Sequence, residues 1–440
     1  MPDLRDNPLF NSMPSFTAKE WNASGAIFSY GKMDLRCFVV EVVLKEDVRG
    51  DILLAAVDKA LVRLPYYRQT FVRKKGLYYY ASNDLPFLVA ECDEARAVGG
   101  AGTNYHMVDV TYSVRTVRFA MNHAFCDGLG LNRLIEATIY HYFCLKDGKE
   151  YSSDGIITEA VPYDPAEEFD AFATKTGADV EELKKLSGGE VRFRLPELDE
   201  QGNQGPTMYR LPLKVRTEDL LGWCKACGSS PASAISAFAA LAVEREHHPS
   251  EGVIMNVLPF SLRRFIHADK TFKNCSAAVF LPVRPEDART KSAAELATQL
   301  RGTMKGQMGE EMALLLSSSV NMMTHLGKKM PFFFLKTKVF SMPQTRPQDT
   351  FYVDYVGSLK TPGYEDQVVD VRYLNADPCG GSAFILMSET AGYFHISFSQ
   401  TFSSDRYRQA FCAVLDEAGI AYELMPAETY LNPLSQMPPK

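Results

Sequence analysis

The octapeptide MNHAFCDG, residues 121–128, closes an alternating apolar run and sets a histidine, an acid and a glycine at fixed spacing. Apolar residues at 117, 119 and 121 alternate with other residues, as in a strand with one buried face. Continuing this alternation predicts that His123 points inward and is sheltered. Residues 129–143 follow with apolar residues at helical spacing. His123 and Asp127 are therefore expected in a strand-to-helix connection, where a histidine ring can be oriented rigidly for proton transfer.

The chain before the octapeptide has the pattern of a strand-rich first subdomain. Both faces of residues 34–44 are apolar, which predicts a central strand. Residues 51–64 carry apolar residues at helical spacing and end at Pro65, which disfavours helical geometry before it. Two β-prone runs around a charged turn predict a hairpin at 71–80. A switch in the parity of the apolar positions predicts a turn or a bulge near 113–116.

The chain after the octapeptide predicts a second subdomain that repeats the first in outline. Residues 146–206 are acidic and rich in glycine, as is typical of a connection. We therefore expect a first subdomain at 1–150, a connecting segment at 151–206 and a second subdomain at 207–440. The elements expected in the second subdomain are strands at 208–215, 252–258 and 351–359, a hairpin of 383–388 with 393–402, and helices at 218–227, 231–246, 405–417 and from Ser292 onward.

Composition limits the classes of protein to which the chain can belong. With 440 residues, 46% hydrophobic and 23% charged, it is long and apolar enough for two to three ordered domains. The formal net charge of −7 argues against a general nucleic-acid binder. No apolar run reaches the roughly 20 residues of a membrane span, and the first residues lack the pattern of a secretory signal. Nine cysteines without regular spacing favour a reducing, cytoplasmic location.

Three stretches in this order resemble the signatures of the CoA-dependent acyltransferase superfamily. They are NHAFCDG at 122–128, NVLPFSLRR at 256–264 with Asn274-Cys275, and DYVG at 354–357. The superfamily includes condensation domains of nonribosomal peptide synthetases, alcohol acetyltransferases, plant acyltransferases of the HxxxD type and chloramphenicol acetyltransferase. The resemblance implies a mixed α/β (α+β) fold of two chloramphenicol-acetyltransferase-like subdomains, with mixed sheets flanked by helices and a V-shaped cleft between them.

The resemblance also implies roles for the residues of the octapeptide. His123 would be the general base, taking a proton from an alcohol or amine acceptor that attacks the thioester of an acyl-CoA or acyl-carrier protein. Asp127 would hold the loop by pairing with Arg263, and Gly128 would let the backbone approach closely at the turn. The alternative for Asp127 is an ordinary helix N-cap.

The same resemblance implies the partners of the protein. The co-substrate would be acyl-CoA or another phosphopantetheinyl thioester, with a small-molecule acceptor, no metal and no permanently bound cofactor. We expect a monomer that acts in natural-product biosynthesis. A trimeric antibiotic acetyltransferase is disfavoured, because the resemblance implies that chains of that class are about half the length of this one.

Tyr355, Ser388 and Gln400 are secondary candidates for the substrate-binding cleft where the two halves meet. A tyrosine or serine hydroxyl there could steady the oxyanion of a tetrahedral intermediate. Ordinary strand positions are the alternative for each of the three.

Other histidines and cysteines are assigned no chemistry. His395 is expected on the surface of a strand, and His247-His248 at a solvated helix end. The CxxC at 224–227 has no second pair of ligands, so it is expected to be two helix residues rather than a zinc or redox site.

Two departures from the superfamily pattern keep a second interpretation open. Asn122 stands where many condensation domains have a second histidine, and the DFGWG sequence of the plant enzymes is absent. The alternative to an enzyme is a non-catalytic, condensation-like protein that binds a carrier protein or a small ligand.

Overall fold

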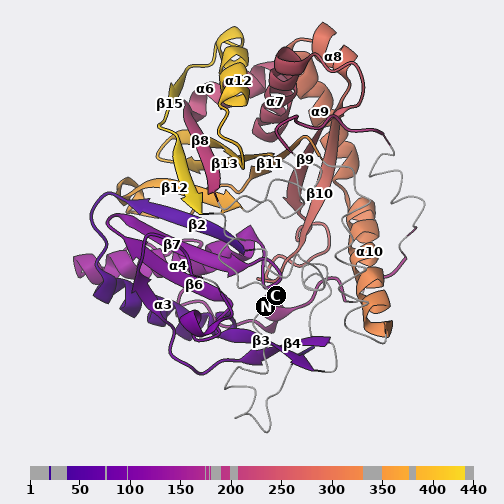
Figure 1. Ribbon diagram of the computed structural model, residues 1–440. Helices are drawn as coiled ribbons and strands as arrows, with labels where there is room; N and C mark the ends of the chain where they lie inside the picture. Colours follow the sequence, from indigo (N-terminus) through magenta and orange to yellow (C-terminus); the bar gives the residue numbers. More distant parts are fainter. Residues whose placement is uncertain are drawn as a thin grey trace.

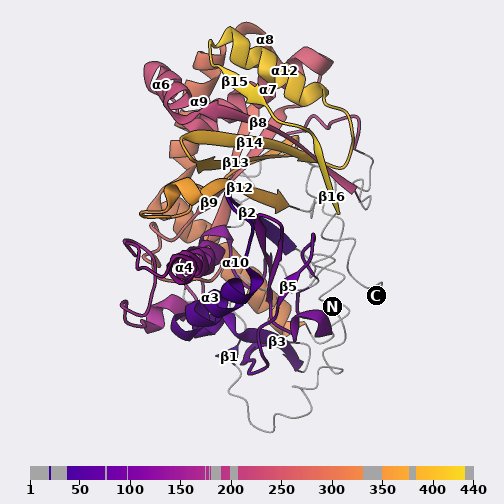
Figure 2. The same cartoon turned by 90° about the vertical axis from the view of Figure 1, so that its left-hand side faces the viewer.

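Two lobes, each built around its own sheet, make up the molecule (Figures 1 and 2). The computed structural model describes residues 19–20 and 37–431, except 75–76, 97, 174, 178, 180–189, 199–206, 331–348 and 376–382. The N-terminal lobe is defined here by a five-stranded sheet and the C-terminal lobe by an eight-stranded sheet. Both sheets carry helices, so the mixed α and β class predicted from the sequence is confirmed.

The sheet of the N-terminal lobe has the strand order β12-β2-β7-β6-β5. Its neighbours are antiparallel except for β5 and β6, which run parallel. A separate small sheet pairs β1, β4 and β3. The elements of this lobe are β1 (Lys19–Glu20), β2 (Cys37–Leu44), α3 (Gly50–Arg63), η3 (Pro65–Tyr67), β3 (Gln69–Lys74), β4 (Leu77–Ser82), β5 (Val89–Glu91), η4 (Ala101–Thr103), β6 (Val108–Ser113), β7 (Thr116–Asn122), α4 (Gly128–Asp147) and β12 (Val368–Asn375).

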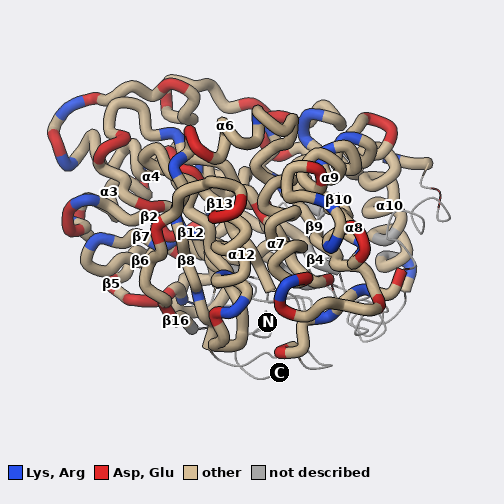
Figure 3. Tube along the Cα trace, turned by 90° about the horizontal axis from the view of Figure 1, so that it is seen from above, with Lys and Arg blue, Asp and Glu red and all other residues tan. Residues whose placement is uncertain are grey.

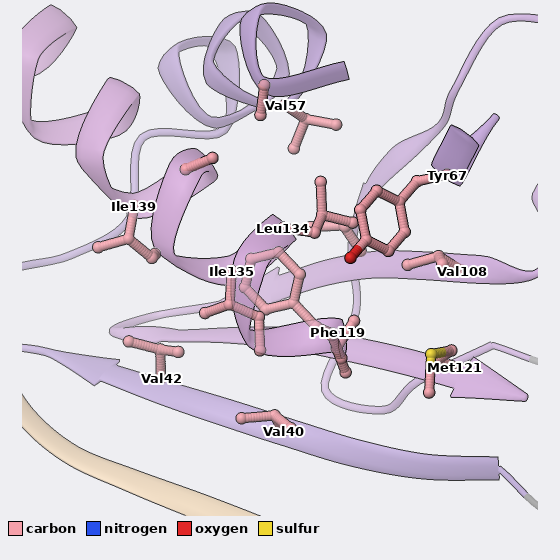
Figure 4. Close-up of a cluster of buried hydrophobic side chains, with 14 of the residues drawn as sticks. Val40, Val42, Val57, Tyr67, Val108, Phe119, Met121, Leu134, Ile135 and Ile139 are labelled. Carbon is pink, nitrogen blue, oxygen red and sulfur yellow. The ribbon is translucent and has the colours of Figure 1, made fainter. Parts of the chain in front are cut away.

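Alternating apolar residues of the strands pack against the helix that follows the octapeptide (Figure 4). Val40 on β2 and Phe119 on β7 are fully buried against Leu134 and Ile135 of α4. Each such side chain stabilises the fold by roughly 1.5–3 kcal/mol relative to an exposed one. The core thus fixes where β7 ends and α4 begins, which are the two ends of the candidate loop.

The sheet of the C-terminal lobe has the order β10-β9-β11-β13-β14-β8-β15, with β16 also paired to β8. Its elements are β8 (Thr207–Arg216), α6 (Thr217–Cys227), α7 (Pro231–His247), β9 (Ile254–Ser261), β10 (Ser276–Val283), α8 (Pro285–Thr290), α9 (Ala293–Gln307), α10 (Glu310–Lys329), β11 (Phe351–Tyr355), β13 (Ala383–Thr390), β14 (Tyr393–Gln400), α12 (Arg406–Glu417), β15 (Tyr422–Leu424) and β16 (Glu428–Leu431). Capping boxes at Ser230 and Ser292 begin α7 and α9.

One strand joins the two lobes. β12 lies far beyond residue 207 in the sequence, yet it pairs antiparallel with β2, with Tyr373 opposite Val40 and Val371 opposite Val42. β2 therefore lies between β12 and β7, which confirms the prediction of a central strand for residues 37–44. Residues 34–36 of the predicted strand lie outside the described residues. The sheet of the N-terminal lobe takes its edge strand from the second half of the chain.

A long hairpin of the C-terminal lobe reaches the N-terminal lobe in the other direction. β9 and β10 pair antiparallel from Ser261–Ser276 to Ile254–Val283, and residues 262–275 form the loop between them. The connecting segment holds this loop, because Glu167 of η5 (Pro165–Glu168) accepts a hydrogen bond at its carbonyl from the Phe272 amide. The Phe272 ring stacks on Tyr66 at a centroid distance of 4.5 Å. The loop is thus held against the connecting segment and the N-terminal lobe.

Charged residues are interspersed along the chain (Figure 3). Figure 3 shows Lys and Arg and Asp and Glu scattered over the trace, with both signs on several of the outer loops. In the described ranges no single helix is long and apolar enough to cross a membrane, and only α6 and α7 together, with a bend of 86° between them, have that length and composition.

Candidate active site

The octapeptide forms a tight turn between β7 and α4. Asn122 is buried, and its side-chain oxygen accepts a hydrogen bond of 2.9 Å from the Ala124 amide. Its carbonyl accepts a second bond, also of 2.9 Å, from the Phe125 amide. An Asn side chain that bonds its own backbone two residues on favours a turn over a continued strand. Asn122 therefore ends β7 and presents His123 on the turn.

His123 is half-buried between the two lobes. Its ring packs edge-on against Phe38 at the start of β2, with the ring centroids 5.2 Å apart. The side-chain nitrogen of Asn274, from the β9–β10 loop, lies 3.2 Å from His123 Nδ1 and 3.3 Å from the His123 carbonyl oxygen. The histidine thus contacts residues of both lobes. The expected shelter is partial, because the ring lies one residue past the end of the strand.

Asp127 is both a helix N-cap and one half of a buried ion pair. Its Oδ1 accepts a hydrogen bond of 2.8 Å from the Gly130 amide at the start of α4. Arg263 donates to both carboxylate oxygens, from Nη1 at 2.7 Å and from Nη2 at 2.8 Å. The Cys275 amide donates a further bond of 2.9 Å. The two interpretations of Asp127 from the sequence are therefore compatible.

Arg263 joins the octapeptide to the β9–β10 loop. Besides Asp127, its guanidinium donates to the carbonyls of Thr271 at 3.0 Å and Lys273 at 2.7 Å. The side chains of Arg263 and Asp127 are each only 7% exposed. Burial raises the pKa of Asp127 and is the largest single influence on it. The charge and hydrogen bonds of Arg263, together with the bonds from the Cys275 and Gly130 amides, outweigh burial, so the pKa lies below its usual value. The carboxylate is thus charged at neutral pH, with its hydrogen-bonding capacity used by the protein.

Gly130 is a more constrained glycine than Gly128. A Cβ added at Gly128 would lie 3.1 Å from Cγ1 of Val356, a side-chain methyl group that can shift. A Cβ added at Gly130 would lie 2.0 Å from the Phe272 carbonyl oxygen and 2.9 Å from Cβ of Cys126. Only glycine allows the first turn of α4 to lie this close to the β9–β10 loop. The sequence indicates the importance of Gly130 only by placing a glycine within a helical pattern.

A Gly130→Ala substitution is expected to destabilise the protein, although alanine is the better helix former. Relieving the overlap with the Phe272 carbonyl must move the β9–β10 loop, and overpacking of this kind costs about 1–3 kcal/mol or more. Gly302→Ala is the matched control, because the added methyl at this exposed position in α9 meets no atom within 4 Å and should stabilise the helix by roughly 0.5–1 kcal/mol. Urea unfolding of both variants measures the difference, and equal midpoints would contradict the expectation.

The thiols near the octapeptide are inert. Cys126 and Cys275 are both buried. Burial raises the pKa of the Cys275 thiol to about 12, and it raises that of Cys126 as well. A thiol held protonated at neutral pH is a poor nucleophile, so neither cysteine has the chemistry of a covalent acyl carrier.

Each of the three secondary candidates has partners away from His123. The Tyr355 hydroxyl donates to Glu389 at 3.2 Å, and its ring contacts Phe394. The Ser388 hydroxyl donates to the Val371 carbonyl on β12 at 2.6 Å. Gln400 donates from its side chain to two backbone carbonyls, those of Phe402 and Ser404. The structure thus brings together His123, Asp127, Gly128 and Arg263, and gives Tyr355, Ser388 and Gln400 roles in joining strands and loops.

The expectation that His395 is a surface residue was wrong. Its side chain is 13% exposed and lies where β12 crosses the C-terminal sheet, with Nδ1 3.1 Å from Asp370 Oδ1. Asp370 in turn accepts a bond of 2.8 Å from Arg372 on the same strand. Burial lowers the pKa of His395. The strand alternation was right, but the face that looked solvent-exposed is covered by β12, which the sequence did not predict.

The pair His247-His248 divides between the interior and the solvent. His248 is exposed, as expected. His247 is half-buried, and its Nε2 lies 2.6 Å from the Tyr407 hydroxyl of α12. This part of the prediction was wrong, because α12 packs over the end of α7.

Cys224 and Cys227 lie on α6 as expected, and no group of three or more potential metal ligands occurs in the described part of the chain.

Asp354 is a half-buried carboxyl next to the site. Alternation along β11 puts it on the face of Tyr352 and Val356, toward the N-terminal lobe, and opposite Phe351 and Val353. Its carboxyl forms no hydrogen bond with any other described residue. Burial, with a smaller contribution from the charge of Asp127, raises the pKa of Asp354 to about 7. The residue before Tyr355, rather than Tyr355 itself, therefore faces the interface of the lobes.

The raised pKa of Asp354 predicts a pH dependence of stability. The folded protein holds this proton up to about pH 7, whereas the unfolded chain releases it near the ordinary aspartate pKa of 3.8, so stability falls as pH rises between these values. A shift from 3.8 to about 7 corresponds to at most ~4 kcal/mol. In an Asp354→Asn variant this loss is expected to disappear. Urea unfolding at pH 5 and pH 8 tests it, and an equal pH dependence in both proteins would contradict it.

The fold that holds this site resembles solved structures. No family model matches the chain, and no curated protein matches it in sequence. The structure is similar to polyketide synthase associated protein 5 from Mycobacterium tuberculosis, with a TM-score of 0.63 at 12% identity over 91% of this chain and 98% of that one. It is also similar to the first condensation domain of the CDA synthetase, with a TM-score of 0.63 at 14% identity over 93% and 99% of the two chains. The chain has the condensation-domain and acetyltransferase fold.

A third similar structure contains coenzyme A. TRI101 from F. sporotrichioides, complexed with coenzyme A and T-2, matches with a TM-score of 0.61 at 10% identity over 92% of this chain and 99% of that chain. The predicted resemblance to the CoA-dependent acyltransferase superfamily is therefore confirmed at the level of the fold, including its two related subdomains. At 10–14% identity the match extends to the fold alone.

Proposed function

We propose that the protein is an acyltransferase that moves an acyl group from a thioester, either acyl-CoA or an acyl-carrier protein, to an alcohol or amine. The observation that carries the proposal is the position of His123. It lies on a turn at the junction of the lobes, and the turn is tied to the C-terminal lobe by the buried ion pair of Asp127 with Arg263. The fold supports it, because the condensation-like neighbours include acetyltransferases and condensation domains.

His123 would be the general base of a direct transfer. A ring nitrogen takes the proton from the acceptor hydroxyl or amine while the acceptor atom attacks the thioester carbonyl. The tetrahedral intermediate then collapses, the carbon–sulfur bond breaks, and the imidazolium returns the proton to the thiolate. No covalent acyl-enzyme is needed, which agrees with the inert thiols of Cys126 and Cys275. Proton transfer of this kind contributes about 10²- to 10⁴-fold to the rate.

Asp127 and Arg263 would position the turn that carries His123 and would not contact the substrate. Both carboxylate oxygens and three guanidinium nitrogens are bonded within the protein. A carboxylate bonded in this way is a poor acid or base for substrate. It holds the strand-to-helix turn in one position, which a proton transfer over about 3 Å requires.

The test is turnover of purified protein with a panel of donors and acceptors. Acetyl-, long-chain acyl- and aromatic acyl-CoA, and the same acyl groups on a carrier protein, are each offered with alcohols and amines, and thiol release is followed. Transfer that requires His123 supports the proposal. Carrier-protein binding that persists in a His123→Ala variant, with no turnover for any donor, supports the alternative of a non-catalytic binding protein.

A further inference from the structure

The amide of Asn274 has one possible orientation. Its oxygen accepts a hydrogen bond of 2.9 Å from the backbone amide of Ser276 and one of 2.7 Å from the Ser276 hydroxyl. A backbone N–H can only donate, so rotating the amide by 180° would place two donors against each other. Asn274 is also 2% exposed, which leaves no solvent to compensate. The nitrogen of the amide therefore faces His123.

The orientation of Asn274 determines the role of His123 Nδ1. The Asn274 nitrogen lies 3.2 Å from Nδ1 and 3.3 Å from the His123 carbonyl oxygen, and its two hydrogens can serve both. Because this nitrogen only donates, Nδ1 must be the acceptor. A neutral imidazole carries one proton, so an acceptor at Nδ1 places that proton on Nε2.

We propose that Asn274 is a positioning residue that holds His123 as the Nε2–H tautomer in the substrate-free protein. Ser276 fixes Asn274, and Asn274 fixes both the ring and the carbonyl of His123. The β9–β10 loop thereby controls both functional residues of the octapeptide, since it also supplies Arg263 to Asp127.

The proposal has a consequence for catalysis, and this consequence rests on the proposed function. In the substrate-free tautomer the ring lone pair is on Nδ1, where the Asn274 amide occupies it. For His123 to take a proton at Nε2, the ring proton must first move from Nε2 to Nδ1. That exchange requires the Asn274 amide to leave Nδ1, because two N–H groups cannot face each other at 3.2 Å.

The tautomer can be read without any substrate. The protein is labelled with ¹⁵N at its 8 histidines, and the ring nitrogens are observed by two-bond ¹H–¹⁵N correlation above the titration range of the rings. The signals of His123 are those lost in a His123→Gln variant. In the wild-type protein we expect the unprotonated nitrogen to be Nδ1.

Two variants separate the role of Asn274 from a merely structural one. Asn274→Asp keeps the shape but replaces the donor by an acceptor, so the ring is expected to switch to the Nδ1–H form. Ser276→Ala removes the hydroxyl but keeps the backbone amide that orients Asn274, so the Nε2–H form is expected to persist. A wild-type ring in the Nδ1–H form, or a ring that remains Nε2–H in Asn274→Asp, overturns the proposal.

These outcomes are independent of the activity assay. The spectra contain no donor or acceptor, so a protein that never transfers an acyl group would still report its tautomer. Conversely, turnover that requires His123 would stand even if Asn274 did not set the tautomer. If Asn274→Asp failed to fold, the wild-type spectrum alone would still decide whether Nδ1 is the unprotonated nitrogen.

Discussion

An alanine in place of His123 is expected to lower the rate of acyl transfer by about 10²- to 10⁴-fold while the protein stays folded. The ring is half-buried and lies on the turn between β7 and α4, outside both elements of the core, so the fold is expected to tolerate its loss. The rate should fall through kcat, because the proton is transferred only as the acceptor attacks. Thiol release under saturating donor and acceptor measures it.

The control for this variant is another histidine outside the site. His325 is exposed on α10, and His325→Ala should leave both the rate and the unfolding midpoint unchanged. A His123→Ala protein with the unfolding curve and the turnover of the wild type would remove His123 from the mechanism. One that fails to fold would instead show that the ring is a structural residue.

Arg263→Met is expected to be the most destabilising of the substitutions considered. Methionine keeps much of the length and removes the charge, so Asp127 would remain buried without its cation. Breaking a buried pair by removing one partner costs about 3–5 kcal/mol. The carbonyls of Thr271 and Lys273 would lose their donor as well. The free energy of unfolding from urea titration at pH 7 measures the loss.

The same loop contains a matched ion pair on the surface. Lys270 bonds Asp164 at 2.6 Å, but its side chain is 65% exposed, and solvent screens pairs of this kind. Lys270→Met should therefore leave the unfolding midpoint close to that of the wild type. Similar losses in the two variants would mean that the effect comes from the loop in general and not from the buried charge.

Local patterns were sufficient to predict most helices and hairpins. The apolar spacing at 51–64 and 129–143 corresponds to α3 and α4, and the parity switch at 113–116 is the turn between β6 and β7. These patterns involve residues that are only a few positions apart in the sequence, so they can be recognised in a single sequence. β12 was missed because its partner β2 is more than 300 residues away, and no local pattern records which strand pairs with which.

Some residues of the candidate site could likewise be predicted from the sequence, and others could be found only in the structure. His123, Asp127 and Arg263 could be named because each belongs to a stretch that resembles a known superfamily. Asn274 belongs to such a stretch too, but its role follows from the direction of one backbone amide, that of Ser276, which no residue pattern encodes. Asp354 and Tyr355 are adjacent, and one residue of strand register decides which of them faces the other lobe.

The N-terminal sheet takes its edge strand β12 from the second half of the chain, and this has a consequence for the synthesis of the protein. β2 is translated early, and its second edge stays unpaired until Asn375 has been added, about 330 residues after Leu44. At roughly 5–20 residues per second this interval lasts on the order of 15–70 s. An apolar strand with an open edge is a template for pairing with other chains during that time. Synthesis in the cell thus passes through a period in which the nascent N-terminal lobe depends on dilution or chaperones until its last strand emerges from the ribosome.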